Sequence, residues 1–346
     1  MVMNELKKSF YDRVLKIRDV DEDLVDELSK MKLAVVGLGG LGADISAALV
    51  KNGFRYFKLI DPDILLYTDV YRGVNFKSDD TGYFKVEVVK KILERLASDV
   101  EVIIYPQTLT DFNIDRLFRD VDLVIDATDN IYSKALINRY SVSRDIPVIY
   151  TAVKDNKGVI IFLEPDKTAC FECFHPDIED VDDGYINGYG FQYIYSIVYS
   201  IASSEVTSYF LGYDPKLHGS MVRVSPNLDI EINYLSKNPQ CRICSSKAAV
   251  EYPDFDYQYF LKGDTFIYTS DERVRLDIER LSRELAKKHI LFRRGDAGVF
   301  FEYYGNIRVG VSYSGTVVVI GVTGFDEGVS TTRRLVEDML YQFVID

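Results

Sequence analysis

The stretch that most restricts the fold of this chain is KLAVVGLGGLGADI, residues 32–45. Lys32–Gly37 is a largely apolar run of the kind that a parallel strand buried on both faces requires. Glycines follow in the pattern G-x-G-G-x-G, and Ala43–Asn52 then carries an apolar helical face. A strand that enters a helix through such a turn is typical of nucleotide-binding α/β units, because backbone N–H groups and the positive helix end can approach phosphate oxygens. The glycines predicted to bind the cofactor are Gly37, Gly39, Gly40 and Gly42.

Strands and helices alternate after this turn, which predicts right-handed crossovers and a doubly wound, mostly parallel sheet. From residue 158 the pattern changes to antiparallel-type strands around one long helix at Gln192–Leu211. The predicted parallel strands are Tyr56–Ile60, Val100–Tyr105, Leu123–Asp126 and Pro147–Thr151, and the predicted helices between them are Lys85–Ala97 and Ser133–Arg144.

A composition break after Cys244 separates a small α+β unit from the rest of the chain. We therefore expect an N-terminal helical segment at residues 1–30, a main α/β domain at residues 31–250 and a small α+β domain at residues 256–346. Outside the main domain, helices are predicted at Glu5–Lys30, Asp271–Lys288 and Val329–Phe343.

Composition excludes some classes of function. Of the 346 residues, 47% are apolar, which suffices for a sizeable core, and the net charge of −13 argues against binding to nucleic acid, which needs a basic surface. The charged N-terminal stretch lacks the apolar segment of a secretory signal. Residues 193–212 are broken by serines and by Glu205, so they predict a buried helix rather than a membrane span. We therefore expect a cytoplasmic protein that binds neither nucleic acid nor membrane.

Asp61 ends the second predicted strand, where a carboxylate can accept hydrogen bonds from ribose hydroxyls. The glycine turn and this acid suit NAD or FAD as well as ATP, and in isolation they favour a dinucleotide. Arg72 and Lys85, which follow the ribose-binding turn, shift the balance toward ATP. An enzyme that releases pyrophosphate needs cations at this place, and a charge pair at 4 Å in protein interacts by about 4 kcal/mol. Each of the two residues is equally consistent with an ordinary surface charge.

The sequence LVIDATDN, residues 123–130, places Asp126 and Asp129 at the carboxyl end of a parallel strand, where open α/β sheets bind their ligands. Mg²⁺ that is bound with a nucleotide commonly takes one or two carboxylates together with phosphate oxygens. We predict this role for Asp129, and we predict that Asp126 is a turn or helix-capping residue.

Two C-x-x-C pairs use all four cysteines of the chain. Two such pairs supply the four thiolates of a tetrahedral zinc site, with zinc–sulfur bonds of about 2.3 Å. Because the pairs are far apart in sequence, the metal would connect distant segments and have a structural role. A redox function for a C-x-x-C pair is the alternative. The predicted metal ligands are Cys170, Cys173, Cys241 and Cys244.

The order and spacing of these motifs resemble the ubiquitin-activating superfamily, in its ThiF/MoeB/HesA branch. The resemblance spans roughly Tyr11–Cys244 and includes GLGGLG, the DPD that follows the second strand, DATDN, GVIIFLEP, CFECFHP and NPQCRIC. It implies a Rossmann-like adenylation domain that uses ATP and Mg²⁺. It also implies a substrate, the C-terminal carboxylate of a ubiquitin-like or sulfur-carrier protein that ends in Gly-Gly.

The resemblance further implies roles for individual residues. Asp61 would bind ribose, and Arg72 and Lys85 would bind phosphates. Asp129 would be the magnesium-linked acid. The segment YDR is similar to an N-terminal segment of the family whose arginine reaches ATP in the neighbouring subunit, which implies a homodimer with Arg13 acting in trans; a helix-surface arginine is the alternative. The other predicted cofactor contacts are Asp63 and Asn130.

The chain departs from the family pattern at several positions. Asp69 stands where the family usually has Asn, and Gly73 where it has Gln, and an acid beside the triphosphate would weaken ATP binding unless it joins the metal site. Many relatives also carry a further cysteine, used for a thioester or persulfide, between the first C-x-x-C pair and the long helix, and this chain has none there. We therefore expect the reaction to stop at the acyl-adenylate, with a separate acceptor.

Three alternatives to this function remain open at the level of sequence. One is adenylation of a short peptide or other small carboxylate in modified-peptide or cofactor biosynthesis. Another is an NAD-dependent oxidoreductase. The third is a nucleotide-binding scaffold without catalytic activity.

Overall fold

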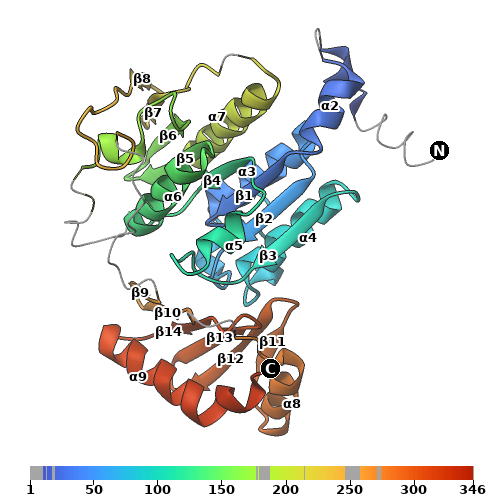
Figure 1. Cartoon of the computed structure of the whole chain (residues 1–346). Helices are drawn as coiled ribbons and strands as arrows, with labels where there is room; N and C mark the ends of the chain where they lie inside the picture. The colour runs from blue at the N-terminus through green and yellow to red at the C-terminus, as the bar shows by residue number, and fades with distance from the viewer. Residues whose placement is uncertain are drawn as a thin grey trace.

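The computed structural model contains two β-sheets, and a C-terminal domain lies against one end of a larger α/β domain (Figure 1). Within the described part of the chain, no helix is both long and apolar enough to cross a membrane. The described residues are 11–12, 14–17, 20–176, 178, 188–213, 215–245, 258–270 and 274–345.

Five parallel strands form the first part of an eight-stranded sheet, in the order β3-β2-β1-β4-β5. Strands β1 and β4 lie side by side at its centre and are almost entirely buried, as their apolar sequences predict. The chain leaves β1 toward β2 on one side and returns to β4 on the other, so the strand order reverses between them. Sheets of this kind bind ligands at such a point. The parallel strands are β1 (Lys32–Val36), β2 (Tyr56–Ile60), β3 (Glu101–Tyr105), β4 (Leu123–Asp126) and β5 (Val148–Lys154).

Helices cover both faces of the large sheet. Helix α3 packs between α4 and α7, and these three helices lie on one face, while α5 and α6 belong to the crossovers of the opposite face (Figure 1). The doubly wound arrangement predicted from the sequence is confirmed. The helices are α2 (Glu22–Leu28), α3 (Gly40–Asn52), α4 (Lys85–Leu96), α5 (Ile114–Phe118), α6 (Ile131–Arg144) and α7 (Gln192–Phe210).

Three antiparallel strands extend the sheet beyond β5, in the order β6-β7-β8. The reversal between β5 and β6 is a two-residue turn at Asp155 and Asn156, whose φ angles are 50° and 57°. Asp and Asn tolerate this left-handed conformation, and the resulting turn matches the twist of a hairpin. The strands are β6 (Lys157–Leu163), β7 (Ser220–Val224) and β8 (Ile230–Tyr234).

The C-terminal domain is built on a six-stranded antiparallel sheet in the order β11-β12-β13-β14-β10-β9. Helices α8 (Ile278–Lys287) and α9 (Phe325–Leu335) pack on this sheet, α8 against β11 and β12 and α9 against β10 and β14. The strands are β9 (Tyr259–Lys262), β10 (Thr265–Tyr268), β11 (Phe292–Arg294), β12 (Gly298–Tyr304), β13 (Ile307–Ser312) and β14 (Val317–Ile320).

The second sheet is buried on both faces. Along β14, Val317 and Val319 belong to the core of the C-terminal domain, whereas Val318 and Ile320 belong to the core of the large domain. This alternation follows from the two-residue period of a strand, and it explains why all four residues of β14 are apolar. The two domains therefore share one apolar contact surface.

Helix boundaries differ from the sequence predictions where capping decides them. The helix predicted at Asp271–Lys288 begins at Ile278, because the Asp277 side chain accepts a hydrogen bond from the backbone N–H of Arg280 at 2.9 Å. The helix predicted at Val329–Phe343 begins earlier, after Gly324, and continues as a π turn and a 3-10 turn. These turns are Val336–Leu340 and Tyr341–Phe343, and further 3-10 turns lie at Val14–Lys16, Tyr67–Asp69, Ser78–Asp80 and Phe171–Cys173.

Candidate functional site

The glycines between β1 and α3 meet different packing constraints. Gly37 has a φ of 84°, and a Cβ atom there would lie 2.7 Å from the carbonyl oxygen of Ala127 in the loop after β4. A Cβ at Gly42 would lie 1.9 Å from the carbonyl oxygen of Gly37, so this glycine allows α3 to pack against the turn. Gly39, which precedes the first residue of α3, has no neighbouring atom within 4 Å of its Cβ position. An incoming anion can therefore approach the backbone at Gly39.

Asp61 follows β2 and is fixed by the loop backbone. Its Oδ2 accepts a hydrogen bond from the N–H of Leu38 at 2.6 Å, and its Oδ1 accepts one from the N–H of Asp63 at 2.7 Å. Burial raises the pKa of Asp61 to about 6, although the positive charge of Lys85 opposes this shift. The carboxylate is thus held beside the glycine turn.

Lys85, the first residue of α4, is a buried cation surrounded by carboxylates. Its ammonium lies 2.8 Å from Oδ2 of Asp63 and 3.7 Å from Oδ1 of Asp69. Burial lowers the pKa of Lys85, but these carboxylates outweigh burial and raise it above its usual value. Burial likewise raises the pKa of Asp63, but the charges of Lys85 and Lys262 lower it on balance. Lys85 and Asp63 are therefore both ionised near neutral pH.

Asp69 holds the two predicted phosphate ligands in place. It is almost fully buried and forms an ion pair with the guanidinium of Arg72 as well as with Lys85. Its second oxygen accepts a hydrogen bond from the N–H of Leu66 at 2.9 Å, which closes the turn. Asp69 does not line the pocket described below, and its charge is paired with these two cations. Gly73, which also differs from the family pattern, leaves room for the ring of Phe76.

The loop after β4 contains two acids with different surroundings. Asp126 is fully buried, accepts hydrogen bonds from the backbone and hydroxyl of Thr128 and lies 3.2 Å from the ammonium of Lys134. It is therefore the turn residue that the sequence predicts. The side chain of Asp129 is 35% exposed and reaches the pocket. Asn130 caps α6 by accepting hydrogen bonds from the first backbone N–H groups of that helix.

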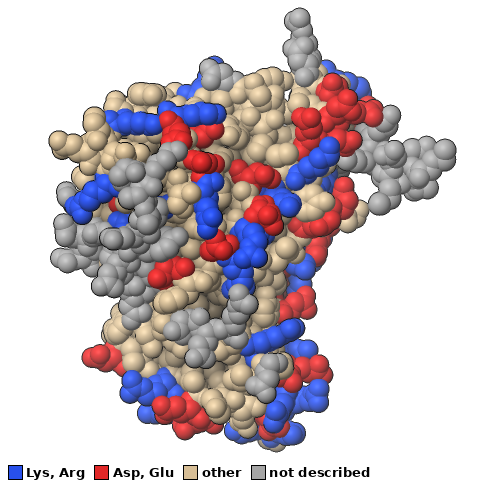
Figure 2. All heavy atoms as spheres, in the orientation of Figure 1, with Lys and Arg blue, Asp and Glu red and all other residues tan. Residues whose placement is uncertain are grey.

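These loops enclose one pocket at the point where the strand order reverses. Gly42 supports the turn without lining the pocket, and Arg13 lies outside the described residues. Acidic and basic side chains lie next to one another over the middle of the face shown in Figure 2. The predicted site residues that line the pocket are Gly37, Gly39, Gly40, Asp61, Asp63, Arg72, Lys85, Asp129 and Asn130.

Sequence reasoning missed several residues of the pocket. Tyr195 of α7 lines it and donates its hydroxyl hydrogen to the carbonyl of Gly188 at 2.9 Å. Phe260, Lys262 and Ile267 reach it from the C-terminal domain, and Lys262 forms an ion pair with Asp129. Nothing in the sequence indicates that strands so distant along the chain meet the nucleotide-binding loops.

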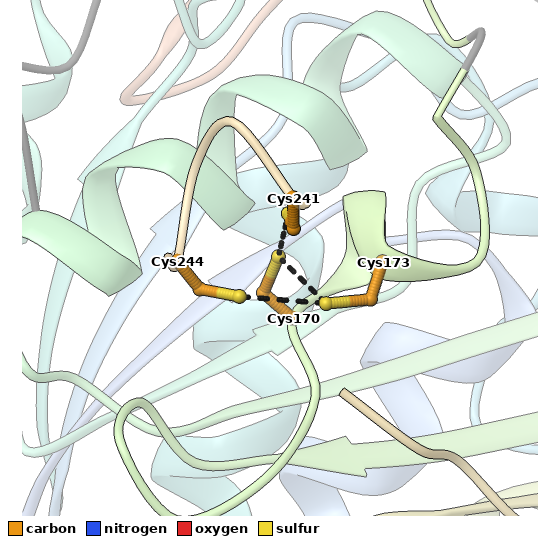
Figure 3. Close-up of side chains that lie close together, drawn as sticks. All are labelled: Cys170, Cys173, Cys241 and Cys244. Atoms are coloured by element: carbon orange, nitrogen blue, oxygen red, sulfur yellow. Dashed lines mark hydrogen bonds between the residues drawn. The ribbon is translucent and has the colours of Figure 1, made fainter. Parts of the chain in front are cut away.

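The four cysteines converge at a second position in the large domain, with their sulfur atoms directed toward one another (Figure 3). Cys170 lies 3.5 Å from Cys241, and Cys173 lies 3.4 Å from Cys244, measured between Sγ atoms. Tetrahedral zinc with bonds of about 2.3 Å requires sulfur atoms about 3.8 Å apart, so the donor set and its spacing fit a zinc ion. The proximity of the two pairs that the sequence predicts is confirmed.

Helix α6 connects the two regions. It begins at the pocket with Asn130 as its cap, and its middle turn holds the first C-x-x-C segment. The amide oxygen of Asn138 accepts a hydrogen bond from the N–H of Phe171 at 2.9 Å. The guanidinium of Arg139 donates two hydrogen bonds to Glu172, at 2.9 and 3.0 Å. This paired contact is buried and fixes the segment that carries the first two thiols.

A protein-family model described as the ThiF family matches residues 11–243. The sulfur carrier protein adenylyltransferase of Thermus thermophilus is 26% identical over 260 residues, which cover 71% of this chain and 95% of that protein. The adenylyltransferase and sulfurtransferase UBA4 of Meyerozyma guilliermondii is 34% identical over 151 residues, which cover 44% of this chain and only 36% of that protein. The match to this second relative is thus confined to about a third of its length.

Solved structures show the same fold. The structure of Escherichia coli MccB with ATP superimposes with a TM-score of 0.58 at 23% sequence identity, over 64% of this chain and 68% of that one. The structure of PaaA has a TM-score of 0.57 at 21% identity, over 66% of this chain and 83% of that one.

Proposed function

The chain belongs to the ThiF family, and from this premise we propose that it is an ATP-dependent adenylyltransferase. Its substrate would be the C-terminal carboxylate of a ubiquitin-like or sulfur-carrier protein that ends in Gly-Gly. The carboxylate oxygen attacks the α-phosphorus of ATP, the bond between the α- and β-phosphates breaks, and pyrophosphate leaves. The products are an acyl-adenylate and pyrophosphate.

One observation carries this proposal. A buried acid that we predict to bind ribose, two cations and a partly exposed acid line a single pocket where the strand order reverses, as the proposed reaction requires. A dehydrogenase needs only the first of these groups. The residues concerned are Asp61, Arg72, Lys85 and Asp129.

Each group would act by position and charge. Asp61 accepts hydrogen bonds from the ribose, and the backbone at Gly39 receives a phosphate oxygen. Arg72 and Lys85 stabilise the negative charge that develops on the leaving pyrophosphate. The reaction needs no general base, because a carboxylate substrate is already ionised at neutral pH. Catalysis would then consist of orientation and electrostatic stabilisation.

We propose that Asp129 holds the Mg²⁺ that accompanies ATP. The side chain of Asp129 suits this role because Mg²⁺ that is bound with a nucleotide commonly takes a carboxylate ligand from the protein. When bound there, the ion would neutralise part of the phosphate charge.

We also propose that the cysteine cluster binds zinc and has a structural role. Since all four cysteines of the chain would be metal ligands, none would remain for a thioester or persulfide. The acyl-adenylate would then pass to a separate sulfur donor or amine. A homodimer with Arg13 acting in trans, and a cytoplasmic location, remain predictions from the sequence.

The experiment that tests the proposal is exchange of labelled pyrophosphate into ATP. We expect exchange only when a carrier protein ending in Gly-Gly is added, and no exchange with the same carrier lacking its last two glycines. The absence of exchange with every carrier tested, together with retention on NAD resin rather than ATP resin, would favour the oxidoreductase alternative.

A second candidate function is the adenylation of a short peptide. The observation that favours it is the similarity to MccB, which has been solved in complex with N-formylated MccA and is described as a microcin C7 biosynthetic enzyme. Exchange supported by short peptides with a free C-terminus, at concentrations at which carrier proteins have no effect, would establish this second function.

A further inference from the structure

The strand at the edge of the second sheet brings a third cation to the pocket. Lys262 is the last residue of β9, and its ammonium forms an ion pair with the carboxylate of Asp129, a residue 133 positions earlier in the chain. The side chains of Lys262 and Asp129 are 39% and 35% exposed, so both remain accessible from the pocket.

The backbone around Lys262 is well fixed. Lys262 pairs with Thr265 across a two-residue turn in which Gly263 has a φ of 60°, so the chain reverses directly after the lysine. Phe260, two residues earlier on the same face of β9, is buried in the core of the large domain. Ile267 on β10 is buried in that same core. The hairpin is thereby anchored to the large domain, and Lys262 is directed toward the nucleotide-binding loops.

The charges of the pocket explain why a third cation matters. Among the described residues, its charged lining consists of three acids and three cations, so the pocket is close to neutral before a ligand enters. Arg72 and Lys85 are each paired with the buried acid Asp69, and Lys85 is also paired with Asp63. A triphosphate would have to share these two cations with the protein. Lys262 forms an ion pair with Asp129, the acid that would bind Mg²⁺ when ATP is present.

We propose that Lys262 is a ligand of the ATP triphosphate and that the C-terminal domain is therefore part of the nucleotide-binding site. This inference depends on the proposed adenylation function. Before ATP binds, Lys262 neutralises Asp129. With ATP in the pocket, Asp129 would be available to hold the accompanying Mg²⁺, and the ammonium of Lys262 would contact a phosphate oxygen.

The test is calorimetric measurement of the dissociation constants of ATP and adenosine for the full-length chain. We expect Lys262→Gln to weaken ATP binding by about 10- to 100-fold, the range for loss of one charge-assisted hydrogen bond, and to leave adenosine binding unchanged. Lys262→Arg should retain most of the ATP affinity, because it keeps the positive charge. Lys287→Gln, which removes an exposed lysine of α8 in the same domain, should bind both ligands like the wild type.

Three outcomes would overturn the proposal in distinguishable ways. If Lys262→Gln binds ATP as tightly as the wild type, the lysine does not contact the phosphates. If it loses ATP and adenosine affinity equally, the lysine only maintains the shape of the pocket. If the wild-type chain itself fails to bind ATP, the adenylation function fails together with this inference.

Discussion

The nucleotide pocket and the cysteine cluster are connected by helix α6, but their charged and ionisable groups are arranged differently. In the pocket, acids and cations are interspersed, and Arg72 and Lys85 each have carboxylate partners within the protein. In the cluster, four groups of one kind face each other. Burial and the neighbouring thiols raise the pKa of Cys244 to about 12, and the pKa of Cys170 is raised in the same way.

This difference indicates what each region does. A pocket of ion pairs with almost no net charge can replace ion pairs within the protein by ion pairs with a ligand. Such a pocket is suited to a molecule that binds and dissociates. Four thiols cannot all be deprotonated together unless a cation compensates their charge, so the cluster is suited to a permanently bound metal. Changes in the pocket should therefore affect activity more than stability, and changes in the cluster should do the reverse.

Asp129→Ala tests the pocket and has the largest expected effect. We expect the rate of ATP–pyrophosphate exchange to fall by about 10²- to 10³-fold, the usual loss when a positioned charge is removed from a transition state. The melting temperature should change little, because the side chain is partly exposed. Asp338→Ala, at an exposed position of the C-terminal domain, is the control. Exchange at the wild-type rate in Asp129→Ala would remove this residue from the site.

Cys241→Ser tests the cluster. We expect loss of the bound metal and a decrease of the melting temperature by roughly 10 °C, because a structural zinc ion contributes directly to the free energy of folding. Metal content by mass spectrometry and thermal unfolding measure the two effects. Gln240→Ser, at the exposed neighbouring residue, should change neither. If the serine variant binds no zinc and melts like the wild type, the cluster has no structural role.

A pair of glycine variants separates effects on stability from effects on ligand binding within the glycine turn. Gly42→Ala should reduce the free energy of unfolding by about 1–3 kcal/mol, because the added methyl group would meet the carbonyl oxygen of Gly37. Gly39→Ala should leave stability unchanged and weaken ATP binding, because the added methyl group would meet no protein atom within 4 Å and would crowd only a bound ligand. Urea unfolding and ATP titration compare the two variants. Equal destabilisation by both substitutions would contradict the interpretation that Gly42 is required for packing and Gly39 for ligand binding.

The pH dependence of adenosine binding has the smallest expected effect. The pKa of Asp61 is raised to about 6, chiefly by burial, so in the folded chain this carboxyl is protonated below that pH. Ionised Asp61 accepts hydrogen bonds from the ribose, and affinity should therefore rise by roughly tenfold between pH 5 and pH 7. Adenosine is used because it carries no titrating phosphate. The affinity of Asp61→Asn should be flat over this range, and a parallel rise in that variant would point to another group.

The raised pKa of Asp61 has the opposite consequence for stability. A carboxyl whose pKa is higher in the folded chain than in the unfolded chain favours folding at low pH, and this contribution is lost as pH rises through about 6. Ligand affinity and the stability contribution of Asp61 thus change in opposite directions across the same pH range.

The large domain was predictable because its features are local in sequence. Buried parallel strands are short apolar runs, and the glycine turn, Asp61 and the DATDN segment each follow one of them directly. The C-x-x-C pairs were predictable because thiol spacing alone indicates a metal site.

The features that could not be predicted from the sequence depend on contacts between segments that are distant along the chain. The role of Asp69 could not be predicted, because burial turned an acid expected beside the phosphates into a partner of Arg72 and Lys85. Lys262 belongs to a domain outside the family resemblance, and only the packing of β9 and β10 on the large domain brings it to Asp129. The start of α8 depended on a cap at Asp277, which periodicity does not reveal.

The most direct test of the account is a crystal structure with a non-hydrolysable ATP analogue and Mg²⁺. We predict that the guanidinium of Arg72 and the ammonium of Lys85 contact the phosphate chain, with the ribose on Asp61. A structure in which both cations remain turned toward Asp69 and Asp63 while the phosphates lie elsewhere would contradict the assignment of this pocket to ATP activation.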